Sequence, residues 1–165
     1  MRRLTFRGLN SNTKENMYGM VNYVEREVSS GIFKETREYP VIVNCNGTTC
    51  PVVKESVAQS VGLEDKDEVT VFEYDIIEFF KKEEEEIKTD NVMIVLWSAR
   101  RFQYIVVNPV DGVITSLAKA VRNSHSFKVI GDCFTIKLSD LPEDSYLNEN
   151  NINRDVIKKI KDGEF

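Results

Sequence analysis

Residues 40–75 contain the densest series of turn and stop signals in the chain, and these signals restrict its fold most strongly. Asn46-Gly47 stands between two β-prone runs, "YPVIVNC" and "TTCPVV". This dipeptide is typical of a two-residue hairpin turn in which both central residues have positive φ. The sequence therefore predicts a hairpin that pairs Cys45 with Thr48 and Val43 with Cys50.

The segment after this hairpin has the pattern of a short helix. Pro51 can open a helix, because the N–H that proline lacks has no partner in the first turn. Val53, Val57 and Val61 recur every four residues, and Gly62 stands where a left-handed residue would end the helix. A charged turn, "EDKDE", and an alternating strand, "VTVFEY", follow, so the segment predicts a helix, a glycine stop, a turn and a strand.

This succession of elements resembles an AbrB-type module, and it resembles half of a double-psi β-barrel equally well. The resemblance covers residues 40–75 and includes the "VGL" stop and the "KDEV" turn. AbrB-type modules are dimeric and read DNA with arginines around their first hairpin. The corresponding hairpin here, "NCNGTTC", has no arginine. The resemblance therefore implies an architecture, and it does not extend to DNA reading by this segment.

Two further helices are predicted in the first and last parts of the chain. Residues 13–30 place an apolar stripe at spacings of three and four, and this stripe suits either core packing or a partner-binding face. Its members are Met17, Met20, Val21, Val24 and Val28. Residues 151–163 repeat this pattern near the C-terminal end. A short helix is also expected in "ITSLAKAVRNS", with Leu117, Ala120 and Val121 facing inward.

The second half of the chain is predicted to be rich in strands. "VMIVLW" and "FQYIVVNPV" would form a hairpin with Arg100 and Arg101 near its tip. "FKVIGDCFTIKLS" is expected to be a strand or a bent strand pair, with Gly131 as a bulge or a turn. Residues 81–90, in the acidic stretch "KKEEEEIKTD", are interpreted as a linker or a solvated helix end. The predicted fold is therefore α+β, with two small sheet-and-helix lobes at 1–80 and 91–165.

Charge and cysteine content limit the classes of partner and compartment. The net charge is −5, and residues 41–90 carry five basic and thirteen acidic groups, whereas the two ends are nearly balanced. This distribution excludes a whole-surface nucleic-acid binder but leaves room for a local basic patch. Three cysteines, and a start without an apolar secretory stretch, predict reduced thiols and a cytoplasmic location.

Catalytic and metal chemistry have little support in the sequence. No nucleotide-binding or nucleophile motif is present, and His125 is the one histidine. Cys45, Cys50, Cys133 and His125 could form a zinc set, but thiols packed among valines explain the cysteines more simply. Acidic residues near 73–78, or Asp132 with Lys137, leave a metal-dependent nuclease as an alternative. We predict no catalytic residues, no metal and no cofactor.

The segment "LWSARRFQY" is the best candidate for a binding surface. It combines two arginines with aromatic side chains, as nucleic-acid and protein interfaces both do, although the aromatics could also face the core. The candidate binding residues are Arg100, Arg101, Trp97, Phe102, Lys119 and Arg122. The leading hypothesis is a non-enzymatic regulatory protein that binds nucleic acid or its machinery. An inhibitor or immunity-type protein of a phage or mobile element, which would bind a protein target, is the alternative.

Overall fold

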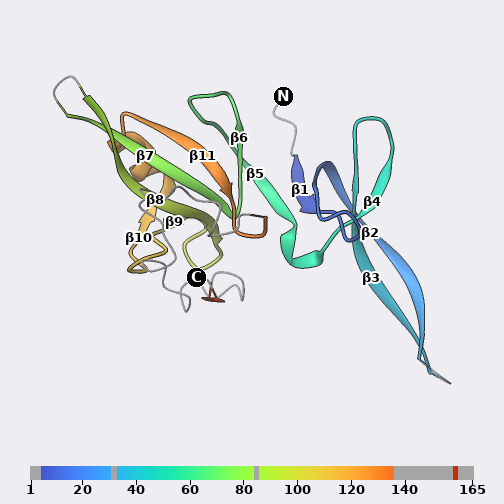
Figure 1. Cartoon of the computed structure of the whole chain (residues 1–165). Coiled ribbons are helices and arrows are strands. Elements are labelled where there is room, and N and C mark those ends of the chain that lie inside the picture. Colours follow the sequence, from blue (N-terminus) through green and yellow to red (C-terminus); the bar gives the residue numbers. More distant parts are fainter. Residues whose placement is uncertain (1–4, 31–32, 84–85, 136–157, 160–165) are drawn as a thin grey trace. The chain divides into compact units, whose positions relative to one another are not determined.

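The computed structural model describes residues 5–30, 33–83, 86–135 and 158–159 (Figure 1). The chain divides into two compact units, Met1–Ser60 and Val61–Phe165. Both are built mostly of antiparallel β-strands. The predicted α+β fold is therefore wrong, and the predicted linker at 81–90 falls on strands of the second unit.

The first unit contains the strands β4-β3-β2-β1-β5 of an antiparallel sheet whose full order is β4-β3-β2-β1-β5-β6, with β6 (Thr70–Phe72) in the second unit. Its strands are β1 (Phe6–Leu9), β2 (Asn16–Ser30), β3 (Phe33–Val43), β4 (Thr49–Pro51) and β5 (Ala58–Glu64), of which β5 continues into the second unit. A 3₁₀ turn, η1 (Lys54–Ser56), precedes β5. The apolar residues Val41, Ile42, Val52 and Ala58 are buried.

Two predicted helices are strands in this unit. Residues 13–30 contribute β2, which pairs with β1 and β3, and residues 51–61 contribute the end of β4, η1 and the start of β5. Both segments are rich in valine, whose branched side chain suits a pleated sheet better than a helix. Gly19 fits the sheet for a steric reason, because a Cβ there would lie 2.1 Å from the carbonyl oxygen of Val43.

The hairpin at Asn46-Gly47 forms, but its predicted register is wrong by one residue. Val43 pairs with Thr49 and Ile42 with Cys50. The N–H of Gly47 donates to the carbonyl of Asn44, and Gly47 alone takes positive φ, at 78°. The side chain of Asn44 accepts the N–H groups of Asn46 and Thr48. These bonds favour a three-residue loop in which only the glycine is left-handed.

β2 and β3 continue as a two-stranded ribbon beyond their pairing with β1 and β4, and they are recognisable in Figure 1 as the two long blue strands. Two neighbouring cross-strand pairs in this ribbon join like charges, Glu25 with Glu38 and Arg26 with Arg37. Like charges directly opposite each other destabilise a strand pair. Arg37 also bonds to Glu35, at 2.7 Å, and this contact lowers the pKa of the Glu35 carboxyl.

Reversing one charge should stabilise this ribbon. Glu38→Lys creates an opposite-charge pair with Glu25, so amide hydrogen exchange in residues 24–28 should slow by about two- to fivefold. Glu35→Lys is the matched control: it makes the same change in net charge but breaks the contact with Arg37, so it should not slow exchange. Equal exchange in both variants would show that the cross-strand repulsion has no effect.

The second unit is built on a five-stranded antiparallel sheet with order β10-β9-β8-β7-β11. Its strands are β7 (Asp75–Glu83), β8 (Glu86–Ser98), β9 (Gln103–Val107), β10 (Ile114–Ser116) and β11 (Ser126–Asp132). β6 (Thr70–Phe72) precedes the sheet, and the single α-helix longer than one turn in the described residues is α1 (Leu117–Asn123). The predicted bulge at Gly131 is present, between Val129 and Gly131.

Each face of this sheet carries a buried apolar cluster. One cluster contains Ile76, Val92, Ile94, Leu96, Ile105 and Val107. The other contains Val71, Ile77, Phe79, Met93, Val95, Val106, Leu117 and Phe127. The second cluster also receives Ala120 and Val121, so α1 turns inward the three residues that the sequence predicted. Because both faces of the sheet are covered by apolar side chains, the sequences of the central strands are nearly continuous hydrophobic runs.

The loop between β5 and β6 is fixed to β11 by one buried carboxylate. Asp65 is 7% exposed, and its Oδ1 accepts the N–H groups of Asp67 (2.8 Å) and Val69 (2.9 Å). Its Oδ2 accepts the N–H of Val129, at 2.8 Å. Burial raises the pKa of this carboxyl, but the three N–H bonds and the charge of Lys128 outweigh it, so the pKa is lowered overall. The turn that the sequence predicted from its charged residues therefore contains a buried side chain that anchors it to β11.

In the described residues, no helix is long and apolar enough to cross a membrane.

Candidate functional site

The candidate binding residues at positions 97–102 lie at the tip of the β8–β9 hairpin. The two strands stay in register up to the pairs Trp97–Tyr104 and Ser98–Gln103. The N–H of Arg101 then donates to the carbonyl of Ser98, at 3.2 Å, and closes the turn. The hairpin predicted from the sequence is present, and Arg100 and Arg101 occupy its tip.

Trp97 and Tyr104 form an aromatic pair just below this tip. Their ring centroids are 5.1 Å apart and the rings meet edge to face, at 70°. Burial and the charge of Glu73 both raise the pKa of the Tyr104 phenol, so it stays neutral at physiological pH. Trp97 nevertheless remains 45% exposed. The pair therefore holds the indole in place while leaving much of its surface in solvent.

Phe102 is the most exposed large apolar residue in the described part of the chain, at 83%. Its φ is 50°, in the left-handed region that glycine and asparagine occupy with little strain. A phenylalanine here gains little from burial and adopts a strained backbone. Neither burial nor a relaxed backbone conformation accounts for a phenylalanine at this position.

The other two predicted binding residues lie on a different element. Lys119 and Arg122 are exposed positions of α1, whereas the four residues at 97–102 belong to the hairpin. Lys119 lines a pocket, described next. The structure thus gathers Trp97, Arg100, Arg101 and Phe102 at one tip, and it places the two cations of α1 on a separate helix of the same unit.

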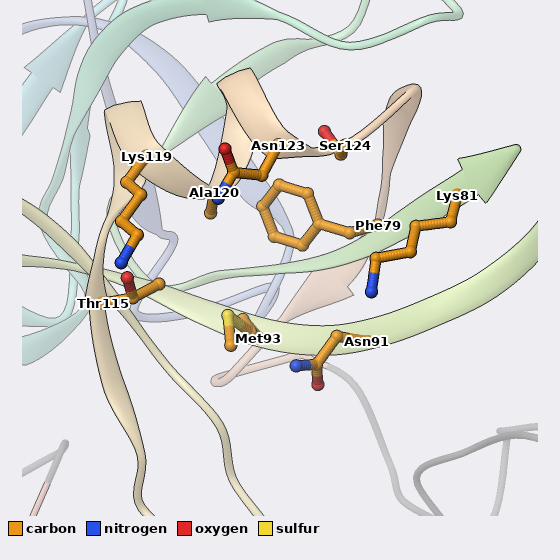
Figure 2. A pocket seen from close by; sticks show the side chains of 9 residues that line it. All are labelled: Phe79, Lys81, Asn91, Met93, Thr115, Lys119, Ala120, Asn123 and Ser124. Carbon is orange, nitrogen blue, oxygen red and sulfur yellow. The ribbon is translucent and has the colours of Figure 1, made fainter.

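The pocket lies between α1 and the sheet and has a volume of about 210 Å³ (Figure 2). Its nine lining residues are Phe79, Lys81, Asn91, Met93, Thr115, Lys119, Ala120, Asn123 and Ser124. Figure 2 shows Lys81 and Lys119 on opposite sides, with Phe79 and Met93 between them. Sequence reasoning missed this pocket, because its residues come from β7, β8, β10 and α1, and no local motif joins them.

A comparison with protein families settles the relationship of the chain. The family model described as "YopX protein" matches residues 5–135. The chain belongs to the YopX family. The resemblance of residues 40–75 to AbrB-type and double-psi modules is therefore wrong, since the YopX match covers both units and residues 51–61 do not form the helix that the resemblance requires. YopX-family membership is compatible with a phage-type protein of uncertain function.

Among solved structures, the crystal structure of protein EF1440 from Enterococcus faecalis is similar to this YopX-family chain. The alignment covers 80% of this chain and 94% of that chain, with 20% sequence identity and a TM-score of 0.41. No curated protein matches the chain.

The residues considered for metal or catalytic chemistry have other positions and bonds in this YopX-family chain. Cys45 and Cys50 lie in the first unit, and Cys133 and His125 in the second; none of the three cysteines forms a disulfide. Asp75 and Asp132 face each other across β7 and β11. Asp75 accepts the N–H of Phe72, and Asp132 accepts those of Phe134 and Thr135. These carboxylates therefore stabilise turns. In the parts of the chain that the structure describes, no three His, Cys, Asp or Glu residues group as metal ligands.

Proposed function

We propose that this YopX-family chain is a non-enzymatic regulatory protein that binds single-stranded nucleic acid through the β8–β9 tip. The observation that carries the proposal is Phe102, an almost fully exposed aromatic ring in a strained conformation beside two exposed arginines. Unpaired bases stack on such rings, and arginines contact the neighbouring phosphates. Phe102 and Trp97 would receive bases, and Arg100 and Arg101 would hold the strand.

The charge of the chain agrees with a small local site of this kind. With a net charge of −5, most of the surface repels a polyanion, so attraction must come from a few cations close to the contact. Single-stranded nucleic acid suits the tip better than a duplex, because bases in a duplex are stacked on each other and present only their edges. We therefore expect binding of short unpaired segments, with strong dependence on salt.

Trp97 provides a direct readout, because it is the one tryptophan in the chain. Titration with a single-stranded oligonucleotide should quench its fluorescence to a plateau, since a base stacked on the indole or beside it opens a route for quenching. A duplex of the same sequence should quench much less. No change with any single strand, under low-salt conditions, would contradict the proposal.

Phe102→Asn separates binding from stability. Asparagine tolerates the left-handed conformation, so the free energy of unfolding should not fall and can rise by up to about 1 kcal/mol. Loss of the stacking ring should weaken oligonucleotide binding by about tenfold or more. The measurements are urea unfolding and the Trp97 titration. If the variant is clearly less stable, or binds the oligonucleotide as wild type does, Phe102 is not part of the binding site.

A protein-binding role is the second candidate, and the same tip supports it. Tryptophan, tyrosine and arginine are the residues most enriched at the energetic centres of protein interfaces. Family membership is compatible with a phage-type protein, which suits an inhibitor that acts on a protein target. Under this alternative the Phe102 and arginine variants would lose the protein partner, and no oligonucleotide would quench Trp97.

A further inference from the structure

The tip of the β3–β4 hairpin carries Asn46-Gly47, the one Asn-Gly dipeptide in the sequence. Both residues are exposed. Among the described residues, no atom beyond the chain neighbours lies within 4 Å of the Cβ that a side chain at Gly47 would have. Solvent therefore reaches the Asn46 amide, and no side chain shields the backbone nitrogen that follows it.

An asparagine followed by glycine has a chemical route to deamidation, and asparagine is among the labile residues of proteins. The backbone nitrogen of Gly47, once deprotonated, attacks Cγ of Asn46 and forms a cyclic succinimide, and the side-chain nitrogen leaves as ammonia. Water then opens the ring. Cleavage of the bond from the ring nitrogen to Cγ gives aspartate, whereas cleavage at the backbone carbonyl carbon gives isoaspartate. The net reaction consumes a water, releases an ammonia and involves no oxidation or reduction.

Asn44 restrains this reaction in the folded chain. Its Oδ1 accepts the N–H groups of Asn46, at 3.0 Å, and of Thr48, at 2.9 Å. Its carbonyl accepts the N–H of Gly47, at 3.0 Å, so the attacking nitrogen is held protonated and directed towards Asn44. The loop must therefore open before the ring can form, and the bonds of Asn44 determine how often it opens.

Asn123 in the second unit provides an internal comparison. It is also exposed and precedes a small residue, Ser124, at the end of α1. The N–H of Ser124 donates to the carbonyl of Ala120, at 3.1 Å, and its hydroxyl donates to that of Val121, at 2.9 Å. The backbone nitrogen after Asn123 is thus held in the last helical turn and carries a side chain beside it, so deamidation should be slower there than at Asn46.

We propose that Asn46 is a site of spontaneous deamidation, that Asn44 controls its rate, and that the product loosens β4. Aspartate adds a negative charge at the tip, and isoaspartate adds an atom to the backbone of the loop. A longer loop cannot keep both side-chain bonds of Asn44 in place. Because β4 is a three-residue strand at the edge of the sheet, its pairing depends on this hairpin. The site does not depend on the function proposed for the β8–β9 tip.

Incubation of the full chain for days at mildly alkaline pH, followed by peptide mass mapping, tests the proposal. Asn46 should gain the mass difference between an amide and a carboxyl group before Asn123 does. Asn44→Ala removes the two side-chain bonds and should speed the reaction by about tenfold. Asn44→Asp is the matched control: it keeps an accepting oxygen at this position and should react at about the wild-type rate. Thermal unfolding checks that each variant is folded.

Two further measurements do not depend on the Asn44 variants. Wild-type chain unfolded in urea lacks the restraining bonds, so it should deamidate at least about tenfold faster than the folded chain. After incubation, amide hydrogen exchange between residues 48 and 52 should be faster in wild type than in Asn46→Gln, which lengthens the side chain and does not form the succinimide.

Four results would overturn the proposal. They are an intact Asn46 at the end of the incubation, a reaction at Asn123 that is as fast or faster, equal rates in the folded and the urea-unfolded chain, and equal exchange in incubated wild type and Asn46→Gln. An unchanged rate in a folded Asn44→Ala variant would remove Asn44 from control of the reaction and contradict the proposal in the same way.

Discussion

Replacing Asp65 by alanine is expected to lower the free energy of unfolding by about 3 kcal/mol or more. The carboxylate accepts three backbone N–H groups, from Asp67, Val69 and Val129. Alanine would leave these donors without their partner, and an unsatisfied buried donor costs about 1–3 kcal/mol. The loop between β5 and β6 would also lose its attachment to β11. Urea unfolding at neutral pH measures the change.

Two further variants test whether the accepting oxygens of Asp65 are the source of this stabilisation. Asp65→Asn keeps the size of the side chain but replaces one accepting oxygen by a donor, so it should lie between wild type and alanine. Asp67→Asn removes only the ion pair with Lys128, in which Nζ lies 3.2 Å from Oδ2 and both side chains are nearly half exposed. It should change the free energy of unfolding by less than about 0.5 kcal/mol. A loss below 1 kcal/mol for alanine would contradict the anchoring role.

The same carboxylate should give the fold an acid-sensitive component. Its pKa is lowered in the folded protein, so its contribution is complete above the unfolded value of about 4 and is lost as the pH falls through the folded value. The stability difference between wild type and Asp65→Asn should therefore be constant from pH 7 to about pH 5 and narrow below pH 4. A difference that stays constant down to pH 3 would show that the charged form is not favoured by folding.

Reversing both tip arginines, Arg100→Glu/Arg101→Glu, should weaken oligonucleotide binding by at least a hundredfold. The change removes two phosphate contacts and adds two groups that repel the strand. Both side chains are exposed, so stability should change by only about 0.5 kcal/mol and the melting temperature by about 2 °C. The titration of Trp97 fluorescence and a thermal unfolding curve provide the two measurements.

Lys14→Glu/Lys54→Glu is the matched control, because it makes the same change in net charge in the first unit. It should weaken binding only slightly if attraction is local to the tip. Equal loss in both double variants would mean that net charge, and not the hairpin, governs binding. An unfolded tip variant would show that the arginines have a structural role, and the proposal for the tip would then fail.

The sequence predicted those elements whose signals are local. The β8–β9 hairpin, the inward residues of α1 and the bulge at Gly131 are confirmed by the structure. Each depends on neighbours within a few residues, namely alternation across a turn, helical spacing and a glycine in a strand. The residues at the hairpin tip could be named for the same reason.

The helices expected at 13–30 and 51–61 were wrong because spacing alone does not decide between helix and strand. Valines three and four residues apart fit a helical stripe, but β2 obtains its partners from β1 and β3, which lie elsewhere in the sequence. Long-range pairing of this kind overrides local periodicity. The pocket and the Asp65 anchor were missed for a related reason, since each joins residues from distant strands.

The salt dependence of oligonucleotide binding tests the central claim most directly. If Arg100 and Arg101 each contact a phosphate, the logarithm of the association constant should fall linearly with the logarithm of salt concentration, with a slope of about −1.4 or steeper for a single strand. Trp97 quenching between about 20 and 200 mM salt measures this slope, and Lys14→Glu/Lys54→Glu should reproduce it. A saturable, linear response with that slope is the result that the account predicts. A slope near zero, or the absence of quenching at the lowest salt concentration, would contradict it.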